Sequence, residues 1–483
     1  MTGIGQQSKF AAVSLLALLA AGCAVGPNYH RPSVPVPAHY SELAGWAKAA
    51  PADGAPKGDW WTGFKDPLLD RLEPKVMVSN QTVREEYYNW QQARALVREA
   101  EGQLFPSVDL SGAAQRARSE GLSASRSASL TASTAALTAS ASWEPDLWGG
   151  IRRQVEQSTA SAQQSQATLA NATLSAQALL ATNVIELRVA DAEILLLKQT
   201  VQAYQASLRI TENQAAAGVA APSDVITART QLEGAQSALI NAGIARAEYE
   251  HAIAVLVGRL PEQLSVPSGG PMPNLPSIPI SLPSTLLQRR PDIAGDERAV
   301  AAANAAIGVQ VAAFYPTVTL TGSGGYSGGP IASLFSAANQ VWSLGADASL
   351  VLFRGGATTA AVAAAEDSYN AAVAAYRGDV LAAFQQVEDQ LANLRILAQQ
   401  ARVQDAAVRD AQRAVEIALN EYEAGTQSYT AVVTARATLL VDQQTALQIR
   451  LNRLLASVDL IQALGGGWSL ADLYGKSRPR VLP

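Results

Sequence analysis

The longest regular feature of the sequence is a seven-residue repeat of apolar positions that occurs twice. Residues 151–217 contain neither glycine nor proline, and apolar residues such as Leu180 and Leu187 return at every seventh position. Residues 357–424, with one glycine, carry the same repeat, and Val387 corresponds to Leu180. A repeat of 3.5 residues predicts long helices packed as left-handed coiled coils. Each helix would be about 100 Å long at about 1.5 Å per residue.

Each long helix is predicted to end at a glycine and turn back. Gly218 and Gly425 follow the two heptad segments, and glycine commonly ends helices because it adopts the left-handed conformation without strain. Return helices are expected at 223–256 and 430–464. Each half of the chain should therefore form a long helical hairpin with a glycine at its tip.

Helices are expected at 89–104 and 296–313, and a period of two marks the segments that lie between each of them and the following long helix. Val108 and Leu110 alternate with Ser107 and Asp109, which is the pattern of a strand with one apolar and one polar face. We expect strands at about 106–117, 129–147, 316–324 and 342–353. Such strands suit a transmembrane β-barrel with a wet lumen, although a soluble half-buried sheet has the same pattern. Four strands cannot close a barrel and open edges are costly in lipid, so several chains would share one barrel.

The two halves of the chain share one plan. Residues 225–229 recur as 432–436, and residues 105–112 recur in related form as 315–322. A proline-rich connector separates the halves. The expected organisation is a signal peptide (1–22), a lipid anchor and Pro-rich tether (23–60), repeat 1 (61–260), the connector (261–291), repeat 2 (292–467) and a C-terminal tail (468–483).

The N-terminus carries the only cysteine of the chain. An apolar run at 10–20 follows Lys9, is too short to span a bilayer, and leads through small residues to Cys23. This pattern predicts a bacterial lipobox, with cleavage before Cys23 and a covalent lipid on its sulfur; a plain secretory signal is the alternative. Ala24, rather than Asp, favours the outer membrane. His30 and His39 are interpreted as solvated residues of an extended tether.

Composition excludes several functional classes. The 483-residue chain is 16% charged with a net charge of −5, so it is neither typical of a disordered protein nor basic enough for nucleic acid. One cysteine and three histidines leave too few ligands for a metal cluster. We therefore expect no metal and no cofactor other than the lipid on Cys23.

An enzyme is also disfavoured. Residues 325–329 satisfy the G-x-S-x-G pattern of a nucleophile elbow, but no histidine follows His251 to serve Ser327 as a base. We interpret this segment as a glycine-rich loop between two barrel strands. Glu144 and Asp146 are the other candidate pair, and they are expected at a strand-to-helix junction rather than in a catalytic site.

Six short motifs occur along the chain: CAVGPNY at 23–29, WW at 60–61, FKDP at 64–67, WEPDLWG at 143–149, LPS at 282–284 and RRPD at 289–292. With the two glycine tips, they resemble those of the TolC-like outer-membrane efflux factors in their lipoprotein (NodT-type) branch. The resemblance implies an α+β membrane protein built from a duplicated unit of β-hairpin and coiled-coil helical hairpin. It also implies a homotrimer, with a twelve-stranded β-barrel in the outer membrane continuous with a twelve-helix α-barrel in the periplasm.

The same resemblance implies partners and a function. The family docks onto a periplasmic adaptor (membrane fusion) protein and an inner-membrane pump, and conducts drugs or other toxic small molecules to the exterior. A type I secretion duct is the nearest alternative, and lipidation favours efflux over it. A structural coiled-coil lipoprotein would explain the heptads but not the strand hairpins.

The resemblance also implies positions for a gate and for adaptor contact. Asp224 and Tyr422 match positions of the periplasmic gate, to which Gln427 and Thr434 are also assigned by position. Gln427 stands where some relatives carry Arg, and Ala431 and Thr434 stand where relatives carry Asp. We expect a less ionic closed state with Asp224 as a single acidic ring; the alternative is that Asp224 caps the helix that begins there. The turns that meet the adaptor are matched by Gly218, Val219, Gly425 and Thr426.

Overall fold

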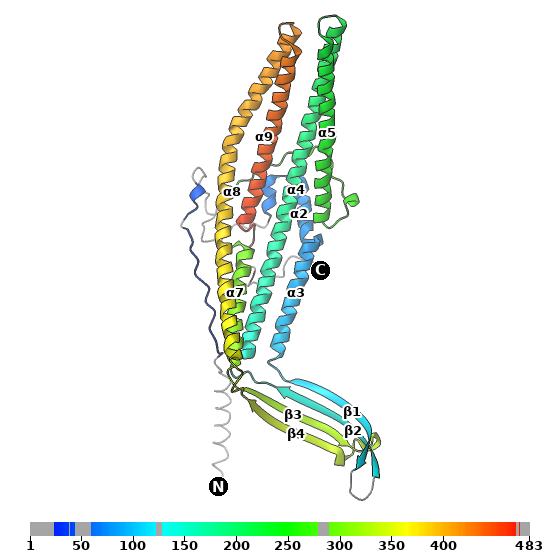
Figure 1. Ribbon diagram of the computed structural model, residues 1–483, viewed down its shortest axis with the longest axis vertical. Coiled ribbons are helices and arrows are strands. Elements are labelled where there is room, and N and C mark those ends of the chain that lie inside the picture. Colours follow the sequence, from blue (N-terminus) through cyan, green and yellow to red (C-terminus); the bar gives the residue numbers. More distant parts are fainter. Residues whose placement is uncertain are drawn as a thin grey trace. The chain divides into compact units, whose positions relative to one another are not determined.

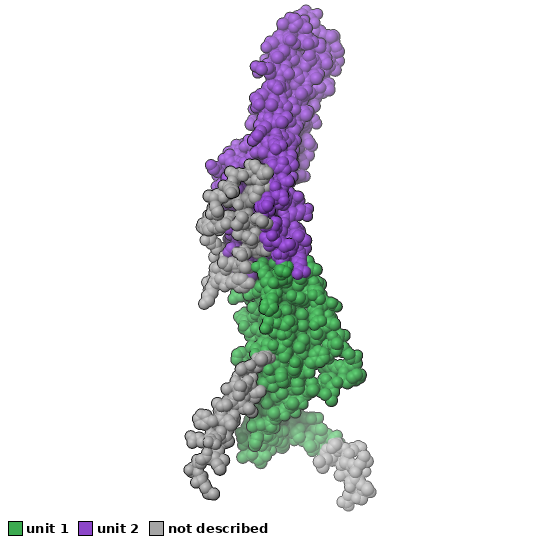
Figure 2. Space-filling view, turned by 90° about the vertical axis from the view of Figure 1, so that its left-hand side faces the viewer, with its two compact units in different colours: residues 1–33, 90–164, 296–376 green, residues 34–89, 165–295, 377–483 purple. Residues whose placement is uncertain are grey.

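The structure is a computed structural model that describes residues 24–37, 39–43, 59–121, 128–278, 289–469 and 473. The predicted signal peptide, Cys23 and most of the predicted tail lie outside these described residues. Two compact units form (Figure 2): unit 1 comprises residues 1–33, 90–164 and 296–376, and unit 2 comprises residues 34–89, 165–295 and 377–483. Each unit draws on both sequence repeats, because corresponding segments of the two halves pack together.

Unit 1 contains a four-stranded antiparallel sheet in the order β1-β2-β3-β4 (Figure 1). Its strands are β1 (Ser107–Gly121), β2 (Ala128–Trp143), β3 (Thr317–Gly328) and β4 (Gln340–Ser349). The central pairing, in which Leu137 lies opposite Tyr326, joins the two halves of the chain. β2 ends before Pro145, which cannot donate to a ladder, and β4 ends at Ser349, so the predicted strand residues Leu350 and Leu352 lie beyond it.

The two faces of the sheet differ as the alternation predicts. Val108, Leu110 and Leu344 lie on one face, which is apolar over most of its length and becomes polar towards the β1–β2 turn. The opposite face carries small polar residues, with Asp109 and Asp347 as its acidic residues on β1 and β4. Much of the apolar face is exposed, since Val108 and Leu110 are each 72% exposed. β1 and β4 form the edges and have no further strand partner within the described part of the chain.

The helices follow the predicted order. The long helices are α4 (Gly150–Ala216) and α8 (Ala357–Glu423), their return helices are α5 (Pro222–Leu256) and α9 (Tyr429–Ala463), and α3 (Gln81–Gly102) and α7 (Pro291–Ala312) precede the strands. Among the described residues, no helix is both long and apolar enough to cross a membrane. Sequence analysis did not predict α2 (Pro67–Ser79) or the short 3-10 helices η1 (Ser41–Leu43), η2 (Trp60–Phe64), η3 (Pro261–Gln263), η4 (Ile331–Ser333) and η5 (Ala337–Asn339).

The heptad residues form the interior of the helical part. Leu180, Leu187, Val380 and Val387 have no exposed surface. Between the two hairpins, Gln444 of α9 donates to Glu193 of α4 at 3.4 Å. The apolar spacing in the sequence therefore corresponds to a packed seam, as expected for a 3.5-residue repeat.

Candidate functional site

The two hairpin tips share one backbone geometry. Gly218 and Gly425 adopt positive φ values of 76° and 73°, and the two amides around each glycine bond back to the end of the preceding helix, as in a Schellman cap. The bonds run from Gly218 N to Ala215 O, Val219 N to Gln214 O, Gly425 N to Tyr422 O and Thr426 N to Glu421 O. A Cβ at either glycine would meet open space, so the backbone angle rather than crowding requires glycine.

The tips present small and apolar surface to solvent. Val219 is 73% exposed at the first tip. Thr426 occupies the same place in the second tip, and its hydroxyl donates to Glu421 O at 3.0 Å. The four predicted adaptor-contact residues therefore lie at the two exposed turns, in places that a docking partner could reach.

Tyr422, a predicted gate residue, lies in a small core just inside the tips. Its ring packs against Tyr429, with centroids 5.3 Å apart, and it is 7% exposed. The cluster also contains Ala228, Ala418 and Val432. The Tyr422 hydroxyl donates to Thr211 Oγ1 at 3.5 Å. In this conformation Tyr422 joins α8 to α4 and α5 within one chain.

Gln427 and Thr434 lie together elsewhere, along a shallow hollow between α8 and α9. Ala431 lines the same hollow, as does the carboxylate-bearing Glu421. The Thr434 hydroxyl donates to Thr430 O at 2.9 Å, and the Ser428 amide donates to Gln427 Oε1 at 3.3 Å. Sequence analysis missed Glu421, although its place beside Tyr422 could have suggested it.

Asp224 is not the cap of α5. The helix begins at Pro222 with Ala221 as the N-cap, so no side chain caps it, and the Asp224 amide donates to Ala221 O at 3.0 Å. The capping hypothesis is therefore wrong, because Asp224 lies two residues inside the helix. The half-buried carboxylate has no hydrogen-bond or ion-pair partner in the described part of the chain. Its charge lies in the first turn, where the helix dipole favours an acid.

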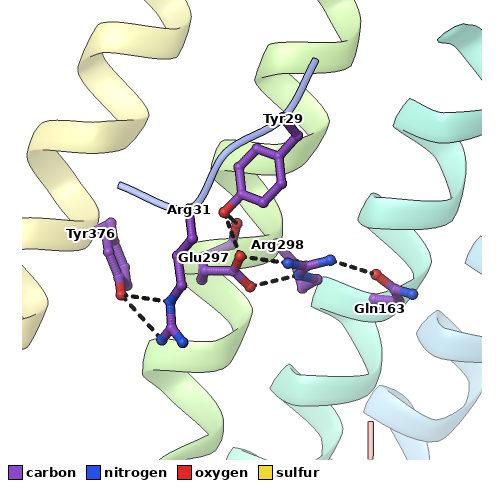
Figure 3. Close-up of polar contacts among 6 residues, drawn as sticks. All are labelled: Tyr29, Arg31, Gln163, Glu297, Arg298 and Tyr376. Carbon is purple, nitrogen blue, oxygen red and sulfur yellow. Dashed lines mark hydrogen bonds and ion pairs between the residues drawn. The ribbon is translucent and has the colours of Figure 1, made fainter. Parts of the chain in front are cut away.

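The residues after Cys23 are extended, as predicted, but they are fastened to unit 1 rather than free (Figure 3). The Tyr29 hydroxyl donates to the carboxylate of Glu297, which Arg298 also binds, and Arg298 reaches Gln163 Oε1 at 3.2 Å. Arg31 donates to the Tyr376 hydroxyl at 3.2 Å. Burial, and then the Glu297 carboxylate, raise the pKa of Tyr29.

The chain comes closest to the helices immediately after Cys23. The Val25 amide donates to Trp148 O at 2.9 Å, and Arg153 donates to Val25 O at 3.1 Å. A Cβ at Gly149, where φ is 82°, would lie 2.5 Å from the Cα of Ala24. This close packing, which composition alone does not reveal, holds Ala24 and Val25 against the start of α4 and Trp148, whose ring stacks on that of Tyr315 with the centroids 5.0 Å apart.

The two residue sets considered for catalysis have structural roles. Ser327 lies within β3, opposite Ala136, so residues 325–328 are strand and not the predicted loop. Such a strand position is not the strand-to-helix turn of a nucleophile elbow. Asp146 caps α4, because its carboxylate accepts from Ile151 N and Arg152 N at 3.2 and 2.9 Å.

Comparison with known sequences gives one consistent result. The model of the family described as "Outer membrane efflux protein" matches twice, at residues 74–259 and 282–466. The chain is 30% identical over 459 residues to the "Probable efflux pump outer membrane protein TtgC" of Pseudomonas putida, covering 94% of this chain and 95% of that protein. It is 28% identical over 457 residues to the "Outer membrane protein OprJ" of Pseudomonas aeruginosa, covering 94% and 95%.

Solved structures agree in fold. The outer-membrane channel OprN superposes with a TM-score of 0.85 at 28% identity, covering 92% of this chain and all of that one. The open-state MtrE outer membrane channel of Neisseria gonorrhoeae gives a TM-score of 0.80 at 25% identity, covering 93% and 99%. Duplicated strand hairpins and long helical hairpins are thus the architecture of known channels.

Proposed function

Because this chain belongs to the outer membrane efflux protein family, it is an efflux channel of the outer membrane, and we propose that it works as a homotrimer coupled to a periplasmic adaptor and an inner-membrane pump. The sheet would cross the outer membrane, and the helical hairpins would extend into the periplasm. Small molecules received from the pump would leave the cell through the shared lumen.

The proposal depends on one observation: neighbouring strands of the sheet are hydrogen-bonded to each other, but the outer edges of β1 and β4 are unpaired within the described residues. β1 and β4 each leave one row of backbone groups without a strand partner in the described residues, and such rows are not tolerated in lipid. Pairing β1 of one chain with β4 of the next satisfies both edges. Three copies contribute twelve strands, which is enough to enclose an aqueous lumen.

The helical hairpins support the same assembly. Large apolar side chains remain more than half exposed on all four long helices, among them Leu195 on α4, Ile240 on α5, Val403 on α8 and Val441 on α9. Such side chains would be removed from water if further helices packed against them. Neighbouring copies around a twelve-helix tunnel would cover these side chains.

The lumen face suggests weak selection of cargo. It carries Ser, Thr and Gly in most rows, such as Ser140 opposite Ser323 and Thr321 opposite Gly345. Small polar side chains leave a wide wet passage and make few specific contacts. Relatives of this chain are named for toluene, solvent and antibiotic efflux, and we infer that this channel likewise passes drug-sized or solvent-like organic molecules supplied by its pump.

Two measurements test this function. The purified chain should run as a trimer on a detergent gel until heated, and it should conduct ions in planar bilayers. Expressed with an adaptor and pump in a strain that lacks its own exit channel, it should restore tolerance to toxic organic compounds. Restored secretion of a protein substrate without restored tolerance would indicate a type I secretion duct instead, and a monomer without conductance would refute the channel.

A further inference from the structure

The apolar face of the sheet ends at a sharp boundary. On β1 the side chains of this face are apolar or glycine up to Ala114, and then become Arg116 and Arg118. On β2 the same face is apolar as far as Ala135 and then becomes Ser133. Ala114 pairs with Ala135 and Arg116 pairs with Ser133, so both strands change from apolar to polar at one level.

Two aromatic side chains lie next to this boundary. Tyr326 of β3 lies one row before it, opposite Leu137, and Phe335 from the β3–β4 loop packs edge-on against Tyr326 at 5.4 Å. Trp143 marks the other end of the face on β2. Ten residues separate Trp143 from Ser133, which is about 34 Å along a strand and about 25 Å across a membrane at a 40° tilt. That is the height of the apolar band of outer-membrane barrels.

The outer end of the sheet is electrostatically positive. The described side chains of β1 at this end include Arg116 and Arg118, whereas residues 316–346 carry no charged residue. Arg116 and Arg118 are exposed. A neighbouring copy that brings its β3–β4 hairpin to this edge would add no charged residue from positions 316–346.

We propose that Arg116 and Arg118 bind the phosphate groups of a phosphorylated glycolipid in the outer leaflet, while its acyl chains lie on the apolar face below. The orientation of the sheet in this inference rests on the proposed function. Guanidinium groups bind phosphate through two parallel hydrogen bonds, which suits a lipid headgroup held at a fixed height. The hydroxyls of Ser133 and Thr131, opposite the two arginines, supply further donors. A trimer would present three such sites.

The experiment measures lipid binding to the detergent-purified trimer by native mass spectrometry, with bisphosphorylated lipid A as the probe. Three proteins are compared: the wild type, R116Q/R118Q, and the matched control R409Q/R413Q, which removes two exposed arginines from α8. We expect wild type and control to bind equally and R116Q/R118Q to bind roughly tenfold or more weakly, since each arginine near an anionic lipid surface contributes appreciably. The same lipid without phosphates should bind all three proteins as weakly as the double variant.

Other outcomes would overturn the proposal. Equal binding of lipid A by wild type and R116Q/R118Q, or equal binding with and without phosphates, would show that the arginines do not recognise the headgroup. Inorganic phosphate alone should not displace the lipid, because it cannot use the apolar face; displacement would indicate a simple anion site. If the glutamine variant does not form trimers, R116K/R118K, which keeps both charges, takes its place, and it should bind more weakly than wild type because lysine lacks the bidentate fork. Absence of a wild-type trimer would instead count against the proposed function.

Discussion

Two buried carboxylates of unit 2 lie in opposite surroundings. Asp66 is fully buried and doubly satisfied, since it accepts from Leu68 N at 2.7 Å and forms an ion pair with Arg188 at 2.8 Å. Glu73, about two turns further along α2, is equally buried, yet neither of its oxygens has a hydrogen-bond partner among the described groups. Burial without a partner raises the pKa of Glu73 from 4.5 to about 9.

The raised pKa of Glu73 predicts a pH-dependent stability. Between about pH 4.5 and 9 the folded state keeps a proton that the unfolded state releases, so stability should fall as pH rises through this window. Glu73→Gln removes the titration. We expect the variant to melt higher than wild type at about pH 8, with a much smaller difference at about pH 5. Parallel melting curves of both proteins across this range would contradict a buried, protonated Glu73.

Asp224 gives a second prediction at the residue scale. Because it does not cap α5 and has no partner in the described chain, its role is expected to be electrostatic. Three copies brought close at a constriction would attract cations. Asp224→Ala should lower cation selectivity and raise single-channel conductance in planar bilayers while leaving trimer yield and melting temperature almost unchanged. Unaltered selectivity would remove Asp224 from the gate.

At the scale of elements, the hairpin tips combine rigid capping with exposed side chains. The Schellman bonds around Gly218 use the backbone amide of Val219 and leave its side chain 73% exposed. Val219→Asp should therefore weaken binding of the periplasmic adaptor and leave the trimer intact. Val255→Asp, at the other end of α5 and 62% exposed, is the matched control. Equal loss of adaptor binding in both variants would argue against a specific tip contact.

The continuity of α4 can be tested in its interior. Leu187 is fully buried near the middle of the helix. Leu187→Pro should cost about 3 kcal/mol or more through the lost backbone bond and the clash with the preceding turn, in addition to the lost packing. Leu187→Ala isolates the packing part, at about 2–5 kcal/mol. Trimer resistance to heat should fall further in the proline variant than in the alanine variant, and equal values would argue against a continuous helix.

At the scale of the whole molecule, the anchoring of the chain's start bears on assembly. The segment after Cys23 is held by backbone and side-chain bonds to Trp148, Arg153 and Glu297, independently of any lipid. Labelled palmitate should enter the wild type and not Cys23→Ser. The variant should nevertheless form heat-resistant trimers, because the barrel holds it in the membrane. Equal labelling of both proteins would refute the lipobox, and loss of trimers in the variant would show that the lipid is needed for assembly.

The sequence by itself determined the elements and their order. Heptad and two-residue periods can be read from the sequence because they depend only on which side chains avoid water. The bounds of α4 and α8 accordingly agree with the predicted bounds to within one residue. The turns at the two tips could also be predicted from their glycines, because the left-handed backbone conformation there disfavours most other residues. The repeat of the first half in the second also follows from sequence alone.

The tertiary structure determined strand pairing and side-chain partners, which the heptad and two-residue periods of the sequence do not encode. The pairing of β2 with β3 joins two strands that end at Trp143 and begin at Thr317, 174 positions apart in the sequence. This pairing placed Tyr326 opposite Leu137 on the apolar face. The burial of Tyr422 and the burial of Glu73 without a hydrogen-bond partner each depend on neighbours distant in sequence. Local periods report exposure averaged along an element, whereas hydrogen-bond partners and charge environments are set by the elements that pack against it.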